Sequence, residues 1–287
     1  MQLLHWLPRL LLRHKSIDFL CKIGLQERIS EITFNNGSRT IVDLSDPEPR
    51  NVFIKREFEP HFFDIANALM PQDGIFFDLG ANVGFCSFGL VSSRPKANFH
   101  MFEASPRMID LLDQSMGLHG QHFFHLNRAC ISNEEGKTAF CLNSNQSGQS
   151  HVATSNENGI EVPNLILDKY CKDHEIERVD FAKIDLEGHE LPALKGWREF
   201  LGNQNVQALY LEIMPENQVR YGRETNAPLL FLESMDYHLY ICKEDDFGFF
   251  GEEVESKELS HGTVKVSHFK AEDYPDDFST DILALPY

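Results

Sequence analysis

Closely spaced cysteines are missing from this sequence of 287 residues. Its six cysteines are scattered along the chain and include no C-x-x-C pair. Zinc sites and redox motifs use such pairs to fix the geometry of the chelate, so the pattern speaks against both. Several cysteines lie within apolar runs, as Cys86 does, which is typical of buried and reduced thiols. We therefore expect a cytoplasmic protein.

Basic residues are also scarce. The chain has 26 Lys and Arg and 44 Asp and Glu, which gives a formal net charge of −18. Such a chain repels a phosphate backbone and has few cationic groups to release its counterions. Nucleic acid is therefore not the expected partner. Residues 244–287 alone hold 12 Asp and Glu and 3 Lys. We expect a solubilising surface in this segment, with a partner-binding or repulsive tail as the alternative.

A long apolar run at the N-terminus is missing too. The stretch Met1–Leu12 is interrupted by His5, Pro8 and Arg9, and no small-residue cleavage site follows it. It is too short to cross a bilayer, so we expect no transmembrane segment. We expect a helix packed on the main domain or on a second subunit, which makes a homodimer compatible with the sequence. A helix on a membrane surface is the alternative.

Apolar residues are present in ordinary amounts, at 42% of the chain, with 23 Phe. A chain of this length can bury one α/β domain of about 200 residues and an attachment. We expect an N-terminal extension of a helix and a hairpin over residues 1–70, with the hairpin turn at 35–37. The main domain follows over 71–243. The acidic segment 244–287 ends in a final strand.

From Ile75 onward, short apolar runs alternate with helical patterns, which is typical of a doubly wound, mostly parallel sheet with helices on both faces. The expected strands are 75–79, 98–102, 122–126, 179–184, 206–213, 238–242 and 281–285. The expected helices are 61–70, 85–91, 106–119, 165–173, 191–201 and 229–235. A hairpin-like stretch at 138–142 and a polar loop at 143–158 interrupt the alternation. The loop is either a lid over the site or a surface loop.

Four of the expected strands end in carboxylates, two of them with glycines close behind: Asp78 with Gly80 and Gly84, Glu103, Asp185 with Gly188, and Glu212. Ligands of open α/β sheets bind at the carboxyl ends of the strands, close to the point where the strand order reverses. One carboxylate at the end of a strand indicates little, because carboxylates are costly inside a strand and are therefore expected at its ends in any case. Four of them predict a binding site at this edge of the sheet.

The sharpest motif is DLGANVG at residues 78–84. Gly80 permits a tight turn and lets a ligand approach the backbone. The pyrophosphate fingerprint G-x-G-x-x-G is absent, because Asn82 and Phe85 replace its later glycines, and no Walker loop follows. An aspartate before the turn suits an ammonium and a sulfonium, and Glu103 can accept both hydroxyls of a ribose. Together these features predict S-adenosylmethionine as the ligand.

Three blocks carry a family resemblance: FDLGANVG at 77–84, FEASP at 102–106 and KIDLEG at 183–188. In order and spacing they resemble successive blocks of the FkbM-type methyltransferases, and the resemblance covers roughly 58–242. It implies a seven-stranded, Rossmann-like sheet of the class I methyltransferases and bound S-adenosylmethionine. It also implies O-methylation of a hydroxyl on a small molecule or glycan, that is, a sugar or another secondary metabolite.

The reaction needs a group that removes the proton of the hydroxyl. Asp185 and Glu212 end neighbouring strands, about 5 Å apart across the sheet, and either could be the base or both could hold a divalent ion. A metal is possible but not expected, since no histidine–carboxylate cluster requires it. His189 is a second candidate base, or a histidine at the start of a helix.

The expected cofactor-binding residues are Asp78, Gly80, Asn82, Gly84, Glu103 and Asn127. Asn82 would bind the carboxylate of the cofactor or cap the next helix, and Asn127 would border the adenine. Two other classes of protein stay open. An NAD-dependent oxidoreductase is disfavoured by the missing middle glycine, and a non-catalytic module with the same fold has no motif in its favour.

Overall fold

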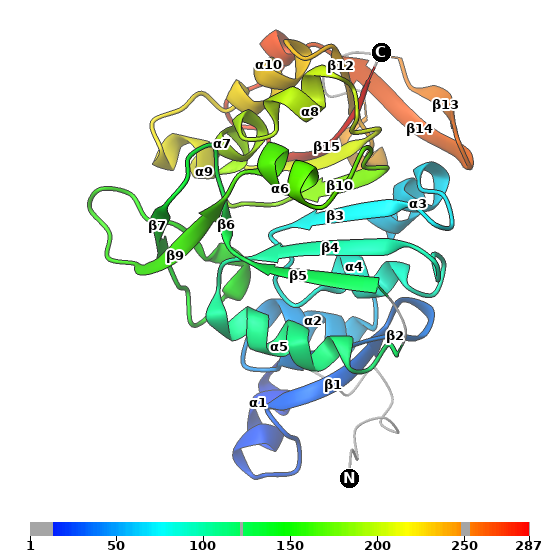
Figure 1. Cartoon of the computed structure of the whole chain (residues 1–287). Helices are drawn as coiled ribbons and strands as arrows, with labels where there is room; N and C mark the ends of the chain where they lie inside the picture. Colours follow the sequence, from blue (N-terminus) through cyan, green and yellow to red (C-terminus); the bar gives the residue numbers. More distant parts are fainter. Residues whose placement is uncertain (1–13, 121–122, 248–252, 287) are drawn as a thin grey trace.

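The computed structural model describes residues 14–120, 123–247 and 253–286. The predicted N-terminal helix over Met1–Leu12 therefore lies outside the described residues. At the centre is a nine-stranded sheet of order β13-β14-β12-β15-β11-β10-β3-β4-β5 (Figure 1). Its five parallel strands are β5 (Phe123–Arg128), β4 (Asn98–Glu103), β3 (Ile75–Leu79), β10 (Phe181–Ile184) and β11 (Leu209–Ile213).

The strand order reverses at β3 in the way expected of a doubly wound fold. From β3 the chain moves outward through β4 to β5, then returns to β10 on the other side and continues to β11. The side chains of these strands alternate between two apolar layers, so Phe76 packs on one face and Phe77 on the other. A strand covered on both faces needs a nearly continuous apolar run, which is the pattern that predicted it.

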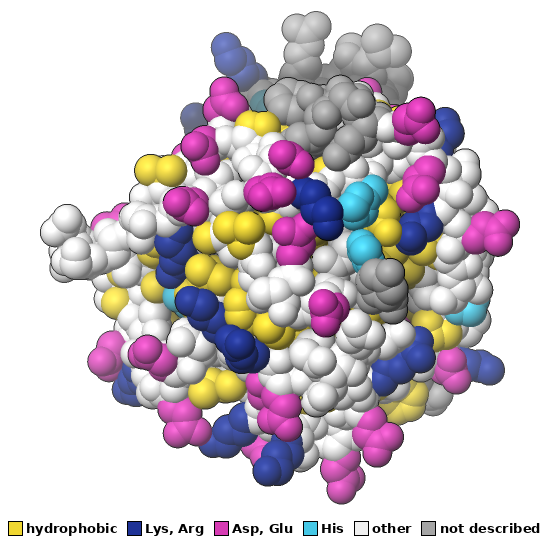
Figure 2. Space-filling model, turned by 90° about the horizontal axis from the view of Figure 1, so that it is seen from above, with side chains coloured by type: hydrophobic (Ala, Val, Ile, Leu, Met, Phe, Trp, Pro, Cys, Tyr) yellow, Lys and Arg dark blue, Asp and Glu magenta, His cyan; other side chains and the backbone are white. Residues whose placement is uncertain are grey.

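The remaining strands are antiparallel and enlarge the sheet beyond the seven that we expected. β15 (Thr280–Pro286) lies between β11 and β12 (Tyr237–Ile241) and is antiparallel to both. A hairpin of β13 (Glu255–Leu259) and β14 (Gly262–Phe269) then extends the edge beside β12. The acidic segment therefore contributes three strands where we expected one. Figure 2 views the molecule from above the orientation of Figure 1 and shows acidic side chains dispersed among basic and apolar ones on that side of the surface.

Helices cover both faces of the sheet (Figure 1). One face is covered by α3 (Pro60–Leu69), α4 (Phe85–Leu90) and α5 (Pro106–Met116), whose buried residues pack on Phe99, Met101 and their neighbours. The other face carries α6 (Leu167–Asp173), α7 (Glu190–Lys195), α8 (Arg198–Gly202) and α10 (Ala227–Glu233). A short helix, α9 (Pro215–Arg220), follows β11. None of the helices in the described ranges combines the length and the apolar character that crossing a bilayer requires.

Two predicted helices differ from the structure. The helix expected over 191–201 is two helices, α7 and α8, which meet at Gly196. A Cβ on Gly196 would lie 2.2 Å from the carbonyl oxygen of Ser132, and the next residue, Trp197, is fully buried against Phe77 with ring centroids 5.3 Å apart. The helix expected over 165–173 begins at Leu167, because the residues before it belong to β9 (Ile160–Leu165).

The predicted N-terminal hairpin is present as β1 (Ile29–Phe34) and β2 (Ser38–Asp43), joined by a 3-10 turn at Asn35–Gly37. It is accompanied by α1 (His14–Lys22) and α2 (Pro47–Lys55). The hairpin is attached to the main domain, since the Thr40 hydroxyl donates to the Val83 carbonyl at 2.8 Å. The N-terminal segment therefore supports the loop that follows β3.

A four-stranded accessory sheet stands beyond the carboxyl ends of the central strands. Its order is β6 (Cys130–Ile131), β9, β7 (Lys137–Cys141) and β8 (His151–Val152). The polar loop expected over 143–158 contains β8 and a 3-10 turn, Ser147–Gln149. This loop contacts the turn after β3, because the Ser147 hydroxyl donates to the Asn82 side chain at 2.9 Å.

Candidate active site

The carboxyl ends of β3 and β10 approach each other most closely at Gly80. This residue has a positive φ of 87°, and a Cβ built on it would lie 1.9 Å from the carbonyl oxygen of Asp185. Any other residue would push the two strands apart, so glycine is required here. The narrow junction lies between two hollows, and both are lined in part by Gly80, Asn82 and Asp185.

The first hollow is mostly apolar. Its walls come from the end of β4, from the accessory sheet with its strand β6, and from the residues after β10. The apolar residues in these walls are Phe102, Ala104, Ala129, Cys130, Ile131, Phe140, Val152 and Leu186. Seven residues with polar side chains also line it: Asn82, Glu103, Ser147, Ser150, Asp185, Glu187 and His189. A flat, apolar ring with a polar group at one end would suit this shape.

Glu103 is fixed by the backbone around it. One carboxylate oxygen accepts the backbone N–H of Asn82 at 2.7 Å, and the other accepts the N–H of Ser105 at 2.8 Å. The side chain is 7% exposed. Burial raises the pKa of Glu103 to about 7, although the N–H bonds act in the opposite direction. Each oxygen has a second lone pair available for a ligand.

The second hollow is strongly acidic. It is lined by seven carboxylates and one ammonium: Asp46, Glu48, Glu59, Asp78, Asp185, Glu187, Glu212 and Lys183. Burial raises the pKa of Glu59 to about 7 and that of Glu187 to about 8. One oxygen of Glu59 is buried and makes no hydrogen bond. Protons therefore neutralise part of this charge near neutral pH.

Lys183 is the cation at the centre of these carboxylates. It is 6% exposed, and its ammonium lies 2.7 Å from an oxygen of Asp185. Burial alone would lower the pKa of Lys183, but the carboxylates around it, Asp185 foremost, raise it well above its ordinary value. Asp78 is more constrained, because one of its oxygens accepts the Ser87 hydroxyl at 2.6 Å.

Asp185 and Glu212 come together as predicted from their strand ends. Ile184 pairs with Leu211 in the parallel ladder of β10 and β11, and the two carboxylates follow directly. Asp185 is the main cause of a strongly raised pKa of Glu212, and burial adds to it. The protonated form of Glu212 is therefore favoured beside Asp185. Among the described residues, neither carboxylate belongs to a group of three metal-ligating atoms within 4.8 Å.

His189 lies just before α7 and lines the apolar hollow. Both ring nitrogens are buried and have no hydrogen-bond partner. Burial, followed by the charge of Arg223, lowers the pKa of His189 to about 4. The ring is therefore neutral at pH 7, with one nitrogen able to accept a proton and the other able to donate one.

Three predicted cofactor residues have roles that the sequence did not show. Asn82 does not cap α4, because Gly84 occupies the cap position; its side chain instead lies between Glu48 and Ser147. Gly84 lies outside both hollows, and a Cβ on it would meet the Phe88 ring at 2.4 Å. Asn127 also lies outside them, with its amide donating to Tyr170 and to the Met101 carbonyl at 3.2 Å.

Sequence reasoning assigned no role in the site to Lys183, Glu48 and Glu59, all of which line the acidic hollow. The turn at Ser147–Gln149 belongs to the polar loop that was expected to be either a lid or a surface loop, and it lies at the rim of both hollows. A signal existed for Lys183, because it is the single charged residue in the apolar strand FAKI. Lysine is almost never fully buried unless it is paired, so its position indicated nearby carboxylates. Glu48 and Glu59 come from α2 and the start of α3, and no sequence pattern links those segments to β10.

Residues 78–239 match the model of a protein family described as the methyltransferase FkbM domain. Methyltransferase sdnD of Sordaria araneosa is 27% identical to this chain, over 50% of this chain and 68% of the relative. Hexuronic acid methyltransferase AglP of Haloferax volcanii is 28% identical, over 50% of this chain and 56% of the relative. Among solved structures, precorrin-6y C5,15-methyltransferase of Geobacter metallireducens is similar, with a TM-score of 0.42 and 11% identity over 80% of this chain and 87% of that chain.

The raised pKa values make the stability of the protein depend on pH. Glu59 and Glu103, at about 7, and Glu187, at about 8, bind more protons in the folded than in the unfolded state. The free energy of unfolding should therefore fall as the pH rises from 6.5 to 8, by about 1 to 3 kcal/mol. The lowered pKa of His189 acts in the opposite direction, but below about pH 6.5.

Urea unfolding at a series of pH values measures this slope. The Glu59→Gln variant should show a shallower slope, because one of the titrating groups is gone. Stability that rises between pH 6.5 and 8, or an unchanged slope in the variant, would contradict the assignment of these protons to Glu59, Glu103 and Glu187.

Proposed function

Since this chain belongs to the FkbM methyltransferase domain family, we propose that it moves the methyl group of S-adenosylmethionine to a hydroxyl of a sugar or another secondary metabolite. Family membership establishes a methyltransferase that depends on S-adenosylmethionine. It gives no support to the alternative function considered from the sequence, that of an NAD-dependent oxidoreductase. The junction at Gly80 carries the rest of the proposal, because it joins an apolar hollow containing Glu103 to an acidic hollow containing Asp185 and Glu212.

The apolar hollow fits the adenosine part of the cofactor. Phe102, Ala104 and Ile131 provide apolar walls for the adenine, and the free lone pairs of Glu103 would accept the ribose hydroxyls. The turn after β3, where Asp78 and Asn82 flank Gly80, would hold the amino-acid end. When bound, S-adenosylmethionine supplies a methyl group that is already activated by its sulfonium.

The acidic hollow fits the acceptor. A hydroxyl gives up its proton reluctantly at neutral pH, so a neighbouring base is required. Asp185 lines both hollows, which puts its carboxylate beside the junction where the two substrates would meet. Lys183 orients the Asp185 carboxylate at 2.7 Å, and the protonated form of Glu212 is favoured beside it. We therefore assign the base to Asp185, with Glu212 as its partner and the neutral ring of His189 as the second candidate.

The charge of the acidic hollow also limits which acceptors could bind there. Seven carboxylates against one lysine would leave a clearly negative wall even with several of them protonated. An acceptor that carries its own carboxylate would be repelled, and like-charge contacts cost several kcal/mol. The name of AglP supports a sugar as acceptor, but for this chain we propose an uncharged or cationic one.

The first prediction tests Glu103. Replacing it with Ala removes a charge-assisted acceptor, so the dissociation constant for S-adenosylmethionine should rise about 10- to 150-fold in isothermal titration calorimetry. Glu134→Ala, which changes an exposed carboxylate, is the matched control and should bind normally. Unchanged affinity in a folded Glu103→Ala protein would remove this residue from the cofactor site.

The next prediction tests Asp185. The Asp185→Asn variant keeps the shape of the side chain and removes the charge that accepts a proton or holds a metal. Turnover should fall at least about 100-fold, the lower range for losing a general base, while cofactor affinity changes only a few-fold. Asp64→Asn, on the exposed side of α3, is the control.

A chelator separates the two roles of Asp185. Wild-type activity that disappears with chelator and returns with Mg²⁺ would assign Asp185 and Glu212 to a metal, whereas indifference to chelator leaves Asp185 or His189 as the base. Loss of cofactor binding with normal turnover at saturation would contradict both and make Asp185 a cofactor ligand.

The third prediction concerns acceptor charge. In a screen of hexose-containing acceptors, neutral sugars and amino sugars should be methylated at least about 10-fold more efficiently than the matching uronic acids, judged by kcat/KM at low salt. Added salt should narrow the difference, since it screens the negative wall. A preference for uronic acids that persists in chelator would show that the carboxylates do not set the specificity.

A further inference from the structure

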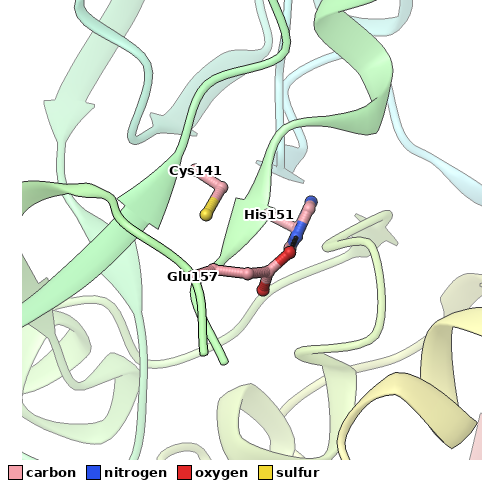
Figure 3. Close-up of side chains that lie close together, drawn as sticks. All are labelled: Cys141, His151 and Glu157. Carbon is pink, nitrogen blue, oxygen red and sulfur yellow. Dashed lines mark hydrogen bonds and ion pairs between the residues drawn. The ribbon is translucent and has the colours of Figure 1, made fainter. Parts of the chain in front are cut away.

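A cysteine, a histidine and a glutamate meet at the base of the polar loop, away from the junction at Gly80. They are Cys141 at the end of β7, His151 at the start of β8, and Glu157 in the turn before β9. One ligand atom from each residue lies within 4.8 Å of the other two (Figure 3). Among the described residues, these three form the one group of this kind.

His151 has an oxygen acceptor beside each of its ring nitrogens. Its Nδ1 lies 2.9 Å from the carbonyl oxygen of Gln149, and a carbonyl can only accept, so Nδ1 carries a hydrogen. The other nitrogen, Nε2, lies 3.2 Å from a carboxylate oxygen of Glu157. In a neutral ring, Nε2 is an acceptor, and two acceptors would then face each other. Either a second proton or a metal cation must lie between them.

The surroundings are those of a metal site. Ligating histidines typically donate their second ring N–H to a backbone carbonyl, and ligating carboxylates are themselves hydrogen-bonded. His151 makes the first of these contacts with Gln149. The second oxygen of Glu157 accepts both the backbone N–H and the hydroxyl of Thr154 at 2.8 Å. These bonds fix the orientation of the Glu157 carboxylate toward His151.

We propose that Cys141, His151 and Glu157 bind a divalent cation of the zinc type. Sulfur, imidazole and carboxylate ligands together are preferred by Zn²⁺, which takes four ligands in a tetrahedron. Water would complete the set, because Glu157 is exposed. On binding, the Cys141 thiol, which donates to the Asn158 carbonyl at 3.4 Å, releases its proton and becomes a thiolate. The thiolate and the carboxylate then balance the two charges of the ion.

The ion would close the loop that reaches the candidate active site. Between Cys141 and His151 the chain runs out to Ser147, whose backbone N–H donates to Asp46 at 2.7 Å and whose hydroxyl donates to Asn82 at 2.9 Å. Gly148, next to it, lines both hollows. A metal at the base of the loop would restrict the movement of this rim without contacting either substrate. The metal site itself does not depend on the proposed function.

Cobalt titration of the full-length, chelator-treated protein tests the site. Co²⁺ should bind with a stoichiometry of one and give a thiolate-to-cobalt charge-transfer band with the strong visible bands of a tetrahedral ion. Zn²⁺ should displace it. The band should disappear in Cys141→Ser, and His151→Gln should weaken binding. Thr154→Val, which removes only a supporting hydroxyl, should weaken it about 10- to 100-fold.

Two controls keep the experiment decisive. Cys21→Ser removes another half-buried thiol, on α1, and should leave the cobalt spectrum unchanged. Cobalt bound only by the carboxylates of the acidic hollow would lack the thiolate band, and Cys86→Ser, which removes the thiol in the lining of that hollow, should leave the band of the wild-type protein unchanged. A wild-type protein without that band at saturating Co²⁺, or a band that survives in Cys141→Ser, would overturn the proposal.

Discussion

The contact between β3 and β10 at Gly80 is the constraint on which the site depends. No Cβ fits there, because it would lie 1.9 Å from the Asp185 carbonyl. This close approach occurs at the point where the strand order reverses, and strand ends on both sides open around it. It therefore joins the apolar hollow at Glu103 to the acidic hollow at Asp185, which is where the proposed cofactor and acceptor would meet.

The same contact concentrates negative charge, and the structure neutralises it in two ways. Lys183 places a buried ammonium among the carboxylates, 2.7 Å from Asp185. Protons neutralise others, as the raised pKa values of Glu59 and Glu187 indicate. The carboxylates that stay ionised can accept a proton from a substrate, as the proposed methylation of a hydroxyl would require.

The segments around the central sheet complete the site. The N-terminal hairpin supports the turn after β3 through Thr40, and α2 and α3 contribute Glu48 and Glu59. From the other side, the accessory sheet supplies apolar walls and the turn at Ser147. The proposed metal site would anchor this last segment. Thus the β3–β10 core fixes where chemistry can occur, and the added segments shape what can enter.

The sequence by itself determined the parallel core, the hairpin at 29–43 and the acidic strand ends, because each follows from a local pattern of apolar runs, turns and carboxylates. Only the tertiary structure decided that β13 and β14 form a hairpin and that the helix breaks at Gly196. It also decided that Gly84 and Asn127 lie outside the two hollows and that Glu48 and Glu59 line the acidic one. Those depend on contacts between segments far apart in the chain, such as Gly196 with Ser132. The local sequence pattern determines where a strand ends and which residue follows it. Packing between segments that are far apart in the chain decides which side chains lie together beyond the strand ends.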